Sequence, residues 1–420
     1  MGAGNFHPHT HISHEAKWQS GVMIAVLVAA LGLGVSSVTA APHAPGDSDS
    51  DKNISGTDPF SPYGRQYVLL KEELARYRAL AEGDQWKPLP SGQPITPGSR
   101  SARVSHLRSL LMLYGDYRPS DFVGADQKSA LDADTYDKSL QQAVRRFQRR
   151  HGLKDDGLVD ERTRSRLNAN PAKLARILSA NLKRWEQLPK DLGPRYIIVN
   201  IPEFNLRLIE GDREQFRMKV VVGKPKHKTP QLATRMTRLE FNPVWRVPPS
   251  IALYELLPKG SSALSAKGYR LVNHRGRAVP FTRGNVAGVR RGKVTLQQKG
   301  GPGNALGRVK FVIPNRHAIF LHDTNSKHLF KKSQRAFSHG CIRLEKPLKF
   351  ARMMLEQQNR WNTARIDRAL MSGRTHGVEL KNPLPVYIAY WTAWVDEHGQ
   401  LQFRPDIYQR DTPKAGLNRG

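Results

Sequence analysis

Residues 322–344, HDTNSKHLFKKSQRAFSHGCIRL, contain the residue types that acyl transfer through a covalent intermediate requires. Cys341 is the only cysteine of the chain. A thiol attacks acyl carbon as the thiolate, and at an ordinary pKa of about 8.5 it is mostly protonated. The imidazole of His322 can take that proton and later return it to a leaving amine. Backbone N–H groups beside a glycine, here Gly340, can bind the developing oxyanion. From these residue types alone, a catalytic thiol and a small buried apolar side chain are equally good interpretations of Cys341.

Helical spacing of apolar residues predicts the elements that come before the β-rich part of the chain. Asp160 can cap one of these helices, and either Asp132 or Asp134 can cap another. The expected helices cover residues 67–82, three short stretches between 103 and 168, and residues 173–188.

From Tyr196 onward the apolar period changes from 3.6 to 2, which is typical of strands. YIIVN, FNLRLIE and FRMKVVVG are the first of these, and Pro347 suits the first position of a later helix. VYIAYWTAWV and LQFRPDIY, joined by residues 396–399, predict a terminal hairpin. The chain therefore has a multidomain α+β pattern, helical first and β-rich afterwards.

Residues 21–35 form an uncharged apolar run, and small residues follow it up to Ala40. This pattern resembles a secretory signal with cleavage after Ala40. An uncleaved anchor is the alternative, although 15 residues are short for a membrane span of about 20. Residues 41–64 are rich in Pro, Gly, Ser and Asp and are predicted to be a linker.

The chain has 67 Lys and Arg against 36 Asp and Glu, a formal net charge of +31. Such a balance favours a polyanionic partner, which could be nucleic acid, an anionic membrane surface or an acidic wall polymer. No nucleic-acid-binding motif accompanies the charge, so nucleic acid is not expected as a partner.

The spacing of His322 and Ser338-His339-Gly340-Cys341-Ile342-Arg343 resembles the signature of the YkuD-type L,D-transpeptidases. The likeness extends to the larger Gram-negative, YcbB-like members over roughly residues 65–410. It includes RYIIVNIPEFNLRLIEG, FNPVWRVPPSI, GGPGNALGRVKF and VYIAYWTAWVDEHG. Residues 147–168 are similar to a three-helix peptidoglycan-binding module. Asn325 departs from the pattern, because many relatives have proline there.

The resemblance implies a β-rich YkuD-like catalytic domain joined to a helical scaffold and the peptidoglycan-binding module. The helices near 66–82 and 173–188 would pair across the chain. The expected boundaries are a signal peptide or anchor at 1–40, a linker at 41–64, a scaffold at 65–97 and 171–193, and the module at 98–170. The catalytic domain would cover 194–372 with a substrate-capping insertion, or an inconsequential surface loop, at 249–299. A hairpin and tail would cover 373–420.

The resemblance also implies the site. Cys341 would be the nucleophile and His322 the general base, with its ring oriented by the backbone carbonyl of Asp323. Gly340 and Cys341 would supply oxyanion N–H groups, while His339 and Ser338 would shape the turn. Arg343 would bind a stem-peptide carboxylate, because its guanidinium can form a two-pronged contact. Trp245 and Asn304 would line the donor groove, or would be structural.

The implied reaction breaks the bond between meso-diaminopimelate and the terminal D-Ala of a donor stem, and a second diaminopimelate amine resolves the thioester to a 3→3 cross-link. It needs no metal or cofactor, and carbapenems would acylate Cys341. The partners would be peptidoglycan stems and glycan in a Gram-negative periplasm, with membrane association if the leader is an anchor. Water or a protein amine as acceptor is an alternative, and a non-catalytic wall-binding scaffold is another.

Overall fold

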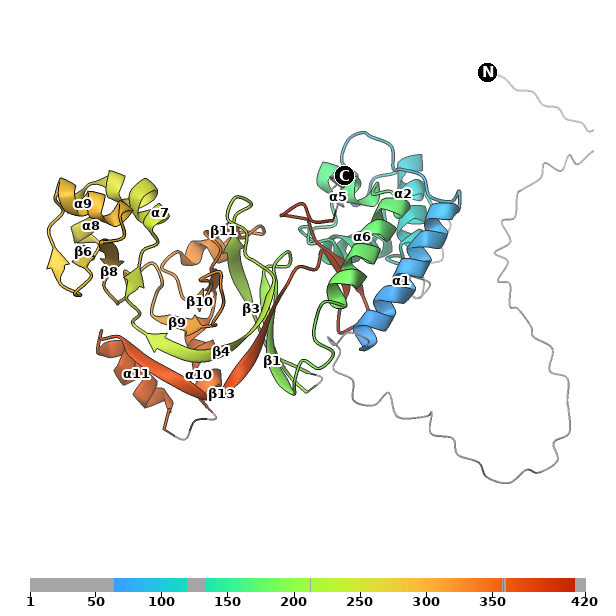
Figure 1. Ribbon diagram of the computed structural model, residues 1–420. Coiled ribbons are helices and arrows are strands. Elements are labelled where there is room, and N and C mark those ends of the chain that lie inside the picture. Colours follow the sequence, from blue (N-terminus) through green and yellow to red (C-terminus); the bar gives the residue numbers. More distant parts are fainter. Residues whose placement is uncertain (1–63, 119–132, 212, 357, 359, 412–420) are drawn as a thin grey trace, which may run out of the picture. The chain divides into compact units, whose positions relative to one another are not determined.

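The computed structural model describes residues 64–118, 133–211, 213–356, 358 and 360–411 (Figure 1). The predicted signal or anchor, the linker up to residue 63, and the last nine residues lie outside these ranges. No helix within the described ranges is both long and apolar enough to cross a membrane.

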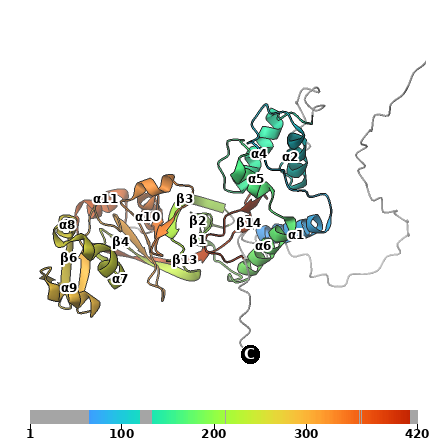
Figure 2. The same ribbon diagram turned by 90° about the horizontal axis from the view of Figure 1, so that it is seen from above.

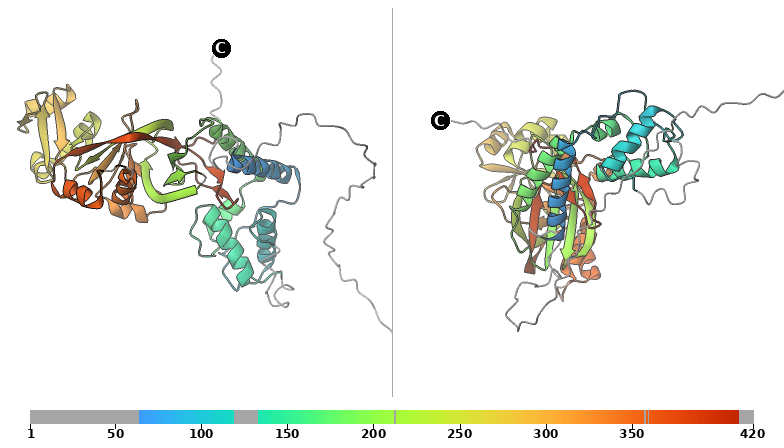
Figure 3. Two further views of the ribbon diagram at one scale, coloured as in Figure 1. Left: turned by 90° about the horizontal axis from the view of Figure 1, so that it is seen from below. Right: turned by 90° about the vertical axis from the view of Figure 1, so that its right-hand side faces the viewer.

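The first described part is helical, as the spacing of apolar residues predicted. Its elements are α1 (Arg65–Glu82), α2 (Ala102–Leu113), α4 (Lys138–Arg150), α5 (Glu161–Leu167) and α6 (Pro171–Trp185). Helices α1 and α6 pack side by side (Figure 3). Their apolar faces, which include Leu70, Tyr77 and Leu178, are buried in a core shared with α2 and α4.

The predicted cap of α4 is wrong. Asp137, not Asp132 or Asp134, caps it, because its Oδ1 accepts a hydrogen bond from the N–H of Leu140 at 2.7 Å. Thr135 forms a β-bridge with Arg100, so the chain is still extended where the helix was expected to begin. The predicted cap of α5 is confirmed, since the Asp160 side chain accepts from the N–H of Thr163.

The second part is built on one sheet of nine described strands, in the order β11-β3-β12-β10-β9-β4-β13-β1-β2. Strand β2 also pairs with β3, so the sheet curls back on itself. The strands are β1 (Arg195–Asn200), β2 (Asn205–Glu210), β3 (Arg213–Gly223), β4 (Leu232–Phe241), β9 (Val309–Val312), β10 (Leu321–His322), β11 (Ala336–Ser338), β12 (Ile342–Leu344) and β13 (His376–Ala389).

The two faces of this sheet differ in character. Phe311, Leu321 and Ile342 point into an apolar core that also contains Phe350 of α10 (Pro347–Leu355) and Ile366 of α11 (Thr363–Met371). Both helices lie beside the sheet (Figures 1 and 2). Because successive side chains of a strand point to opposite faces, the polar residues that alternate with this apolar set lie on the other face.

The insertion at residues 249–299 is folded rather than a long loop. It contributes β6, β7 and β8 to a four-stranded sheet of order β5-β8-β6-β7. Its own core includes Leu264, Leu271 and Leu296. The elements of this region are β5 (Trp245–Arg246), α7 (Pro249–Ile251), η2 (Ala252–Leu256), η3 (Leu257–Lys259), α8 (Ser261–Ala266), β6 (Tyr269–Asn273), β7 (Ala278–Val279), α9 (Arg283–Arg290) and β8 (Val294–Gln298).

The expected terminal hairpin is shorter than the sequence pattern suggested. Residues 386–389 belong to β13, which pairs with β4 on one side and runs parallel to β1 on the other. Only β14 (Ala393–Val395) and β15 (Leu401–Phe403) form the hairpin. The chain between them and β13 contains Trp391, whose ring stacks on Trp185 of α6 with centroids 4.2 Å apart.

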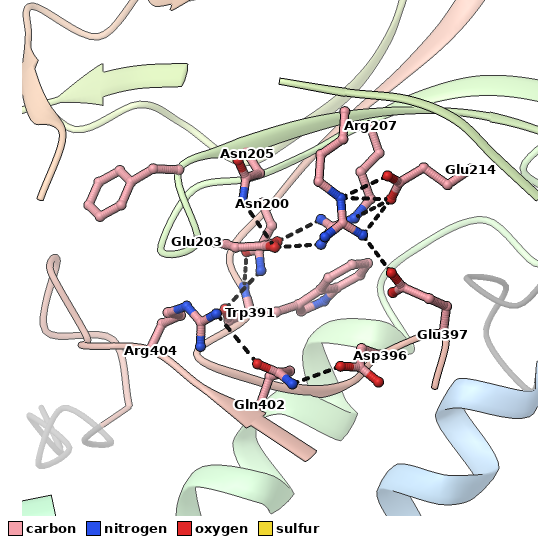
Figure 4. Close-up of polar contacts among 12 residues, drawn as sticks. Asn200, Glu203, Asn205, Arg207, Glu214, Trp391, Asp396, Glu397, Gln402 and Arg404 are labelled. Atoms are coloured by element: carbon pink, nitrogen blue, oxygen red, sulfur yellow. Dashed lines mark hydrogen bonds and ion pairs between the residues drawn. The ribbon is translucent and has the colours of Figure 1, made fainter. Parts of the chain in front are cut away.

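A buried polar network joins the catalytic sheet to this C-terminal segment, and we call it the junction network (Figure 4). Glu203 and Arg207 form a two-pronged ion pair with side chains only 5% and 4% exposed. Arg207 also contacts Glu214. Further members are Asn200, Trp391, Arg217, Glu397, Gln402 and Arg404.

Candidate active site

Two adjacent parallel strands bring His322 and the Cys341 region together. In the ladder between β10 and β12, His322 stands opposite Arg343, and the N–H of Ile342 donates to the carbonyl of Phe320. Cys341 lies in the bend directly before β12 and packs in part against the apolar core. Residues paired in a ladder point to the same face of the sheet, so Arg343 and His322 share one face. This is the face that carries polar residues.

The turn before the nucleophile depends on Gly340, whose φ of +113° is one that residues with a Cβ rarely adopt. The Thr229 hydroxyl donates to the Gly340 carbonyl at 2.7 Å. The Ser338 hydroxyl donates to the Cys341 carbonyl at 2.6 Å and accepts from the Gly340 N–H at 3.1 Å. The Gly340 N–H, which was expected to serve the oxyanion, is thus already bonded within the turn.

The thiol of Cys341 is half-buried, and its Sγ lies 3.9 Å from the carbonyl oxygen of Ala318. Burial raises the pKa of this thiol, although a backbone hydrogen bond from Phe320 and the charges of Lys310 and Arg343 oppose the rise. The described contacts of the thiol do not include the His322 ring. Activation of the thiol therefore requires a proton acceptor when the reaction begins.

His322 is buried, and its Nδ1 lies 2.5 Å from the carbonyl oxygen of Asp323. A carbonyl only accepts, so Nδ1 carries the proton in the neutral ring and Nε2 keeps the lone pair. Burial, reinforced by the charge of Arg343, lowers the pKa of His322 to about 3. The ring is thus neutral near pH 7 and able to accept a proton.

The Asp323 side chain fixes the segment that orients this ring. Its Oδ2 accepts from the N–H of Arg308 at 2.8 Å, and its Oδ1 accepts from Thr324 N–H at 2.7 Å and contacts Lys327 Nζ. A Cβ on Gly307 would come within 2.3 Å of the Asp323 carboxyl group, so only glycine fits there. The loop and His322 are held as one unit.

A row of charged side chains crosses the same sheet face, which we call the charged row: Glu240, Lys310, His322 and Arg343. Glu240 stands opposite Lys310, which stands opposite His322 in the ladder register. Lys310 Nζ lies 3.3 Å from Glu240 Oε2. In contrast, the buried Nε of Arg343 has no partner among the described residues. A partly buried cation left unpaired is costly unless a ligand supplies the anion.

Lys310 and Glu240 were not predicted from the sequence. The strand alternation of VKFV indicates only that Lys310 faces away from the core. Its position beside His322 depends on strand order, which local sequence does not contain.

The other residues expected at the site make contacts with the insertion or with nearby backbone. His339 Nε2 lies 2.6 Å from Glu255 Oε1 of the insertion. Trp245 packs against Tyr269 of the insertion, with ring centroids 6.2 Å apart. Asn304 is buried, its amide donates to three carbonyls, and its Oδ1 accepts from the Leu306 N–H. These contacts favour the structural alternative for Asn304.

No group of three or more His, Cys, Asp or Glu side chains that could hold a metal ion occurs within the described residues. The described residues of the site include a thiol, a neutral imidazole, backbone N–H groups and a guanidinium that forms no ion pair with a described residue. Together they can perform acyl transfer to and from a carboxylate-bearing substrate.

Comparison with known proteins identifies two domains. Residues 194–379 match the YkuD family model, described as "L,D-transpeptidase catalytic domain". Residues 100–167 match a model described as "Putative peptidoglycan binding domain". The chain therefore combines a catalytic domain of the YkuD L,D-transpeptidase family with a peptidoglycan-binding domain, which confirms the resemblance seen in the motif.

Among curated proteins, a "Putative L,D-transpeptidase" of Haemophilus influenzae is 30% identical over 219 residues. The match covers 51% of this chain and 44% of that protein, so the chain spans less than half of its relative's length.

Solved L,D-transpeptidases are similar at lower identity. The enzyme from Mycobacterium smegmatis is 12% identical over 46% of this chain and 58% of that chain, with a TM-score of 0.22. The enzyme from Stackebrandtia nassauensis is 13% identical over 72% and 97%, with a TM-score of 0.25. The assignment of the catalytic domain rests on the family match.

Proposed function

We propose that this protein is a peptidoglycan L,D-transpeptidase that forms 3→3 meso-diaminopimelate cross-links through a thioester on Cys341, with release of D-Ala. The observation that carries the proposal is the placement of a buried, neutral His322, oriented by the carbonyl of Asp323, on the strand that pairs with β12 directly after Cys341. The membership of the catalytic domain in the YkuD family supports the reaction class.

In the proposed acylation, His322 Nε2 takes the Sγ proton and the thiolate attacks the carbonyl carbon of the donor diaminopimelate. The Cys341 N–H donates to the oxyanion of the tetrahedral intermediate. The carbon–nitrogen bond to D-Ala breaks while the imidazolium returns its proton to the departing amine. The amine of an acceptor diaminopimelate then loses a proton to His322 and attacks the thioester, and the thiol is regenerated.

Arg343 would bind a carboxylate of the stem peptide during both steps. The support is its Nε, which is buried without a partner within the described residues. A carboxylate would supply the missing acceptor in a two-pronged contact. Burial has the largest effect in lowering the pKa of His322, and the charge of the same guanidinium adds to it.

The cell wall is the proposed place of action, in a Gram-negative periplasm reached through the N-terminal segment as a cleaved signal or an anchor. Support comes from the peptidoglycan-binding domain and from the Haemophilus relative. The partners would be peptidoglycan stems and glycan. Carbapenems would acylate Cys341, since they present a strained acyl carbon to the same thiolate.

The test is incubation of the purified protein with disaccharide-tetrapeptide, beside Cys341→Ala, with products followed by mass spectrometry. The expected result is a cross-linked dimer with loss of D-Ala, absent in the variant. Tripeptide without dimer would make water the acceptor and support a carboxypeptidase instead. A folded protein that gives no Cys341-dependent product would overturn the enzymatic proposal in favour of a wall-binding scaffold.

A further inference from the structure

The insertion at residues 249–299 has a charge composition unlike the rest of the chain. Of the chain's 67 Lys and Arg it contains ten, but of the 36 Asp and Glu it contains only Glu255. The excess of cations over acids in this segment is thus far steeper than in the whole chain. We call the exposed surface formed by these ten side chains the cap cation surface.

All residues of the insertion are described, and each of the ten cations is exposed. Arg275 and Arg277 lie in the turn between β6 and β7, and Arg290, Arg291 and Lys293 follow one another at the end of α9. None of the ten side chains forms an ion pair with a residue that the structure describes. Neighbouring like charges repel, so this arrangement has no internal compensation.

Folding of the insertion does not need these charges. Its core is apolar, built on Val247, Leu264, Leu271, Val289 and Leu296. Burial of such side chains stabilises a small sheet and its helices without help from surface cations. Exposed, uncompensated cations on a folded unit are explained by an anionic partner outside the chain.

The surface is connected to the catalytic turn. The single acid of the insertion, Glu255, contacts His339, two residues before Cys341. On the other side of that turn, the loop after β3 contains Lys224 and Lys226, and the carbonyl of His227 in this loop packs against Gly223 beside Gly340. Cations therefore continue from the insertion to the immediate surroundings of the nucleophile.

We propose that the cap cation surface binds the anionic glycan-peptide polymer, so that the enzyme selects long uncross-linked strands over single stems. This inference rests on the proposed function and specifies its substrate. Each stem peptide carries more carboxylates than amines, and a strand repeats the stems along its length. One stem occupies the site at Cys341, while neighbouring stems of the same strand contact Arg275, Arg277, Arg290 and Arg291.

The choice of polymer over other polyanions follows from position. The insertion contacts the turn before Cys341 through Glu255 and His339, so a polymer bound to the insertion is held on the unit that touches this turn, and a substrate polymer gains from being held there. A membrane surface or a nucleic acid would be attracted by the same charges, and both are therefore included in the test.

The experiment compares a cap variant, R275Q/R277Q/R290Q/R291Q, with a matched control, K346Q/R368Q/R374Q/K381Q. The control residues are exposed, lie in the same domain outside the insertion, and lose the same four charges. Rates are measured on soluble uncross-linked glycan strands and on disaccharide-tetrapeptide. Binding to strands is measured separately in chains that also carry Cys341→Ala, so that it can be determined even if no turnover occurs.

The expected result is a loss of about tenfold or more in kcat/KM on strands for the cap variant alone, with the disaccharide-tetrapeptide rate within about twofold of the unaltered protein. Added salt should remove the advantage of the unaltered protein, because exposed charges are screened within about 8 Å at physiological ionic strength. Equal strand rates in the cap variant and the control would overturn the proposal, as would an equal loss on both substrates.

Two further outcomes separate this proposal from others. If the cap variant keeps its strand binding but loses binding to phosphatidylglycerol vesicles or to a DNA duplex, the surface serves that polyanion and the proposal is wrong. If no protein gives a cross-linked product while the cap variant alone loses strand binding, the surface is as proposed and the proposed reaction fails.

Discussion

The junction network (Figure 4) and the charged row both place ionisable side chains on the same curled sheet, but the two groups differ in how far their charges are paired. In the junction network, Glu203 and Arg207 neutralise each other while almost fully buried. Although burial alone would raise it, Arg207 lowers the pKa of Glu203 to about 2, so the pair stays ionised. In the charged row, by contrast, Arg343 forms no ion pair with a residue that the structure describes, and the buried ring of His322 is oriented by a backbone carbonyl instead of a carboxylate.

This difference distinguishes charges that hold the fold from charges that await a substrate. A buried ion pair whose two charges neutralise each other gains nothing from a ligand. Removing one partner leaves the other charge buried without compensation. An unpaired cation beside a desolvated imidazole lowers stability and is ready for an anion. Variants in the two regions should therefore separate activity from stability.

The largest effect is expected for His322→Gln. Glutamine cannot accept the thiol proton, so the rate of Cys341 acylation by a carbapenem should fall about 10³- to 10⁴-fold. Stopped-flow acylation measures the rate, and thermal unfolding should show a folded protein with a similar melting temperature. Acylation within tenfold of the unaltered protein would remove His322 from the role of base.

The next effect concerns stability instead of rate. Glu203→Gln leaves Arg207 buried with a neutral partner, and the free energy of unfolding should fall by about 3–5 kcal/mol. Glu214→Gln is the control, because Glu214 contacts Arg207 from a more exposed position and should cost about 1 kcal/mol or less. Urea unfolding measures both. A large loss of kcat in folded Glu203→Gln would contradict the separation of the two regions.

Arg343→Met should lower activity without lowering stability, unlike the substitution of an arginine whose hydrogen bonds are made within the fold. We expect kcat/KM on tetrapeptide to fall about 10- to 100-fold through loss of carboxylate binding, while the melting temperature stays equal or rises. It should also raise the pKa of His322, so that activity declines at a higher pH on acidification.

Arg335→Met is the matched control for this variant. The Arg335 guanidinium donates to the carbonyls of Val220, Phe204 and Lys332. Its loss should therefore lower stability and leave kcat/KM on tetrapeptide unchanged. If both variants lost stability alike, Arg343 would be a structural residue.

The remaining expected effect is a dependence of stability on pH. His322 has a pKa of about 3 when folded and an ordinary value near 6.5 when unfolded. The unfolded chain then binds the additional proton, so stability falls as the pH decreases from about 6.5 toward 3, by up to about 1.4 kcal/mol per pH unit. Urea unfolding at several pH values measures the slope, which should be smaller in His322→Gln. An unchanged slope would show that the ring is not held neutral.

Elements defined by one buried face could be predicted from the sequence. Helices α1, α2 and α5 and strands β1 to β3 follow from the spacing of apolar residues, because burial imposes a period of 3.6 or 2. The motif around Cys341 was sufficient to indicate the catalytic domain. The pairing of α1 with α6 was implied by resemblance, not by spacing, since about a hundred residues separate them.

Features that depend on contacts between distant residues could not be predicted. Glu240, Lys310, His322 and Arg343 form a row only because four strands take one order and register. The Gly340 N–H was expected to bind the oxyanion, but the Ser338 hydroxyl, two residues away, accepts a hydrogen bond from it. Strand β13 was interpreted as part of a hairpin, because an apolar run does not reveal whether its neighbours are local.

The position of β13 in the sheet affects the order in which the chain can fold. This strand lies between β4 and β1, and its parallel partner Ile197 was synthesised almost two hundred residues earlier than Val386. The gap between β4 and β1 therefore stays open until nearly the whole chain has left the ribosome, although β2 already pairs with β3, and pairing over such a separation is slow. Closure of the sheet is therefore a late event, and a chain shortened before residue 376 would contain the nucleophile but lack the strand that fills the gap between β4 and β1.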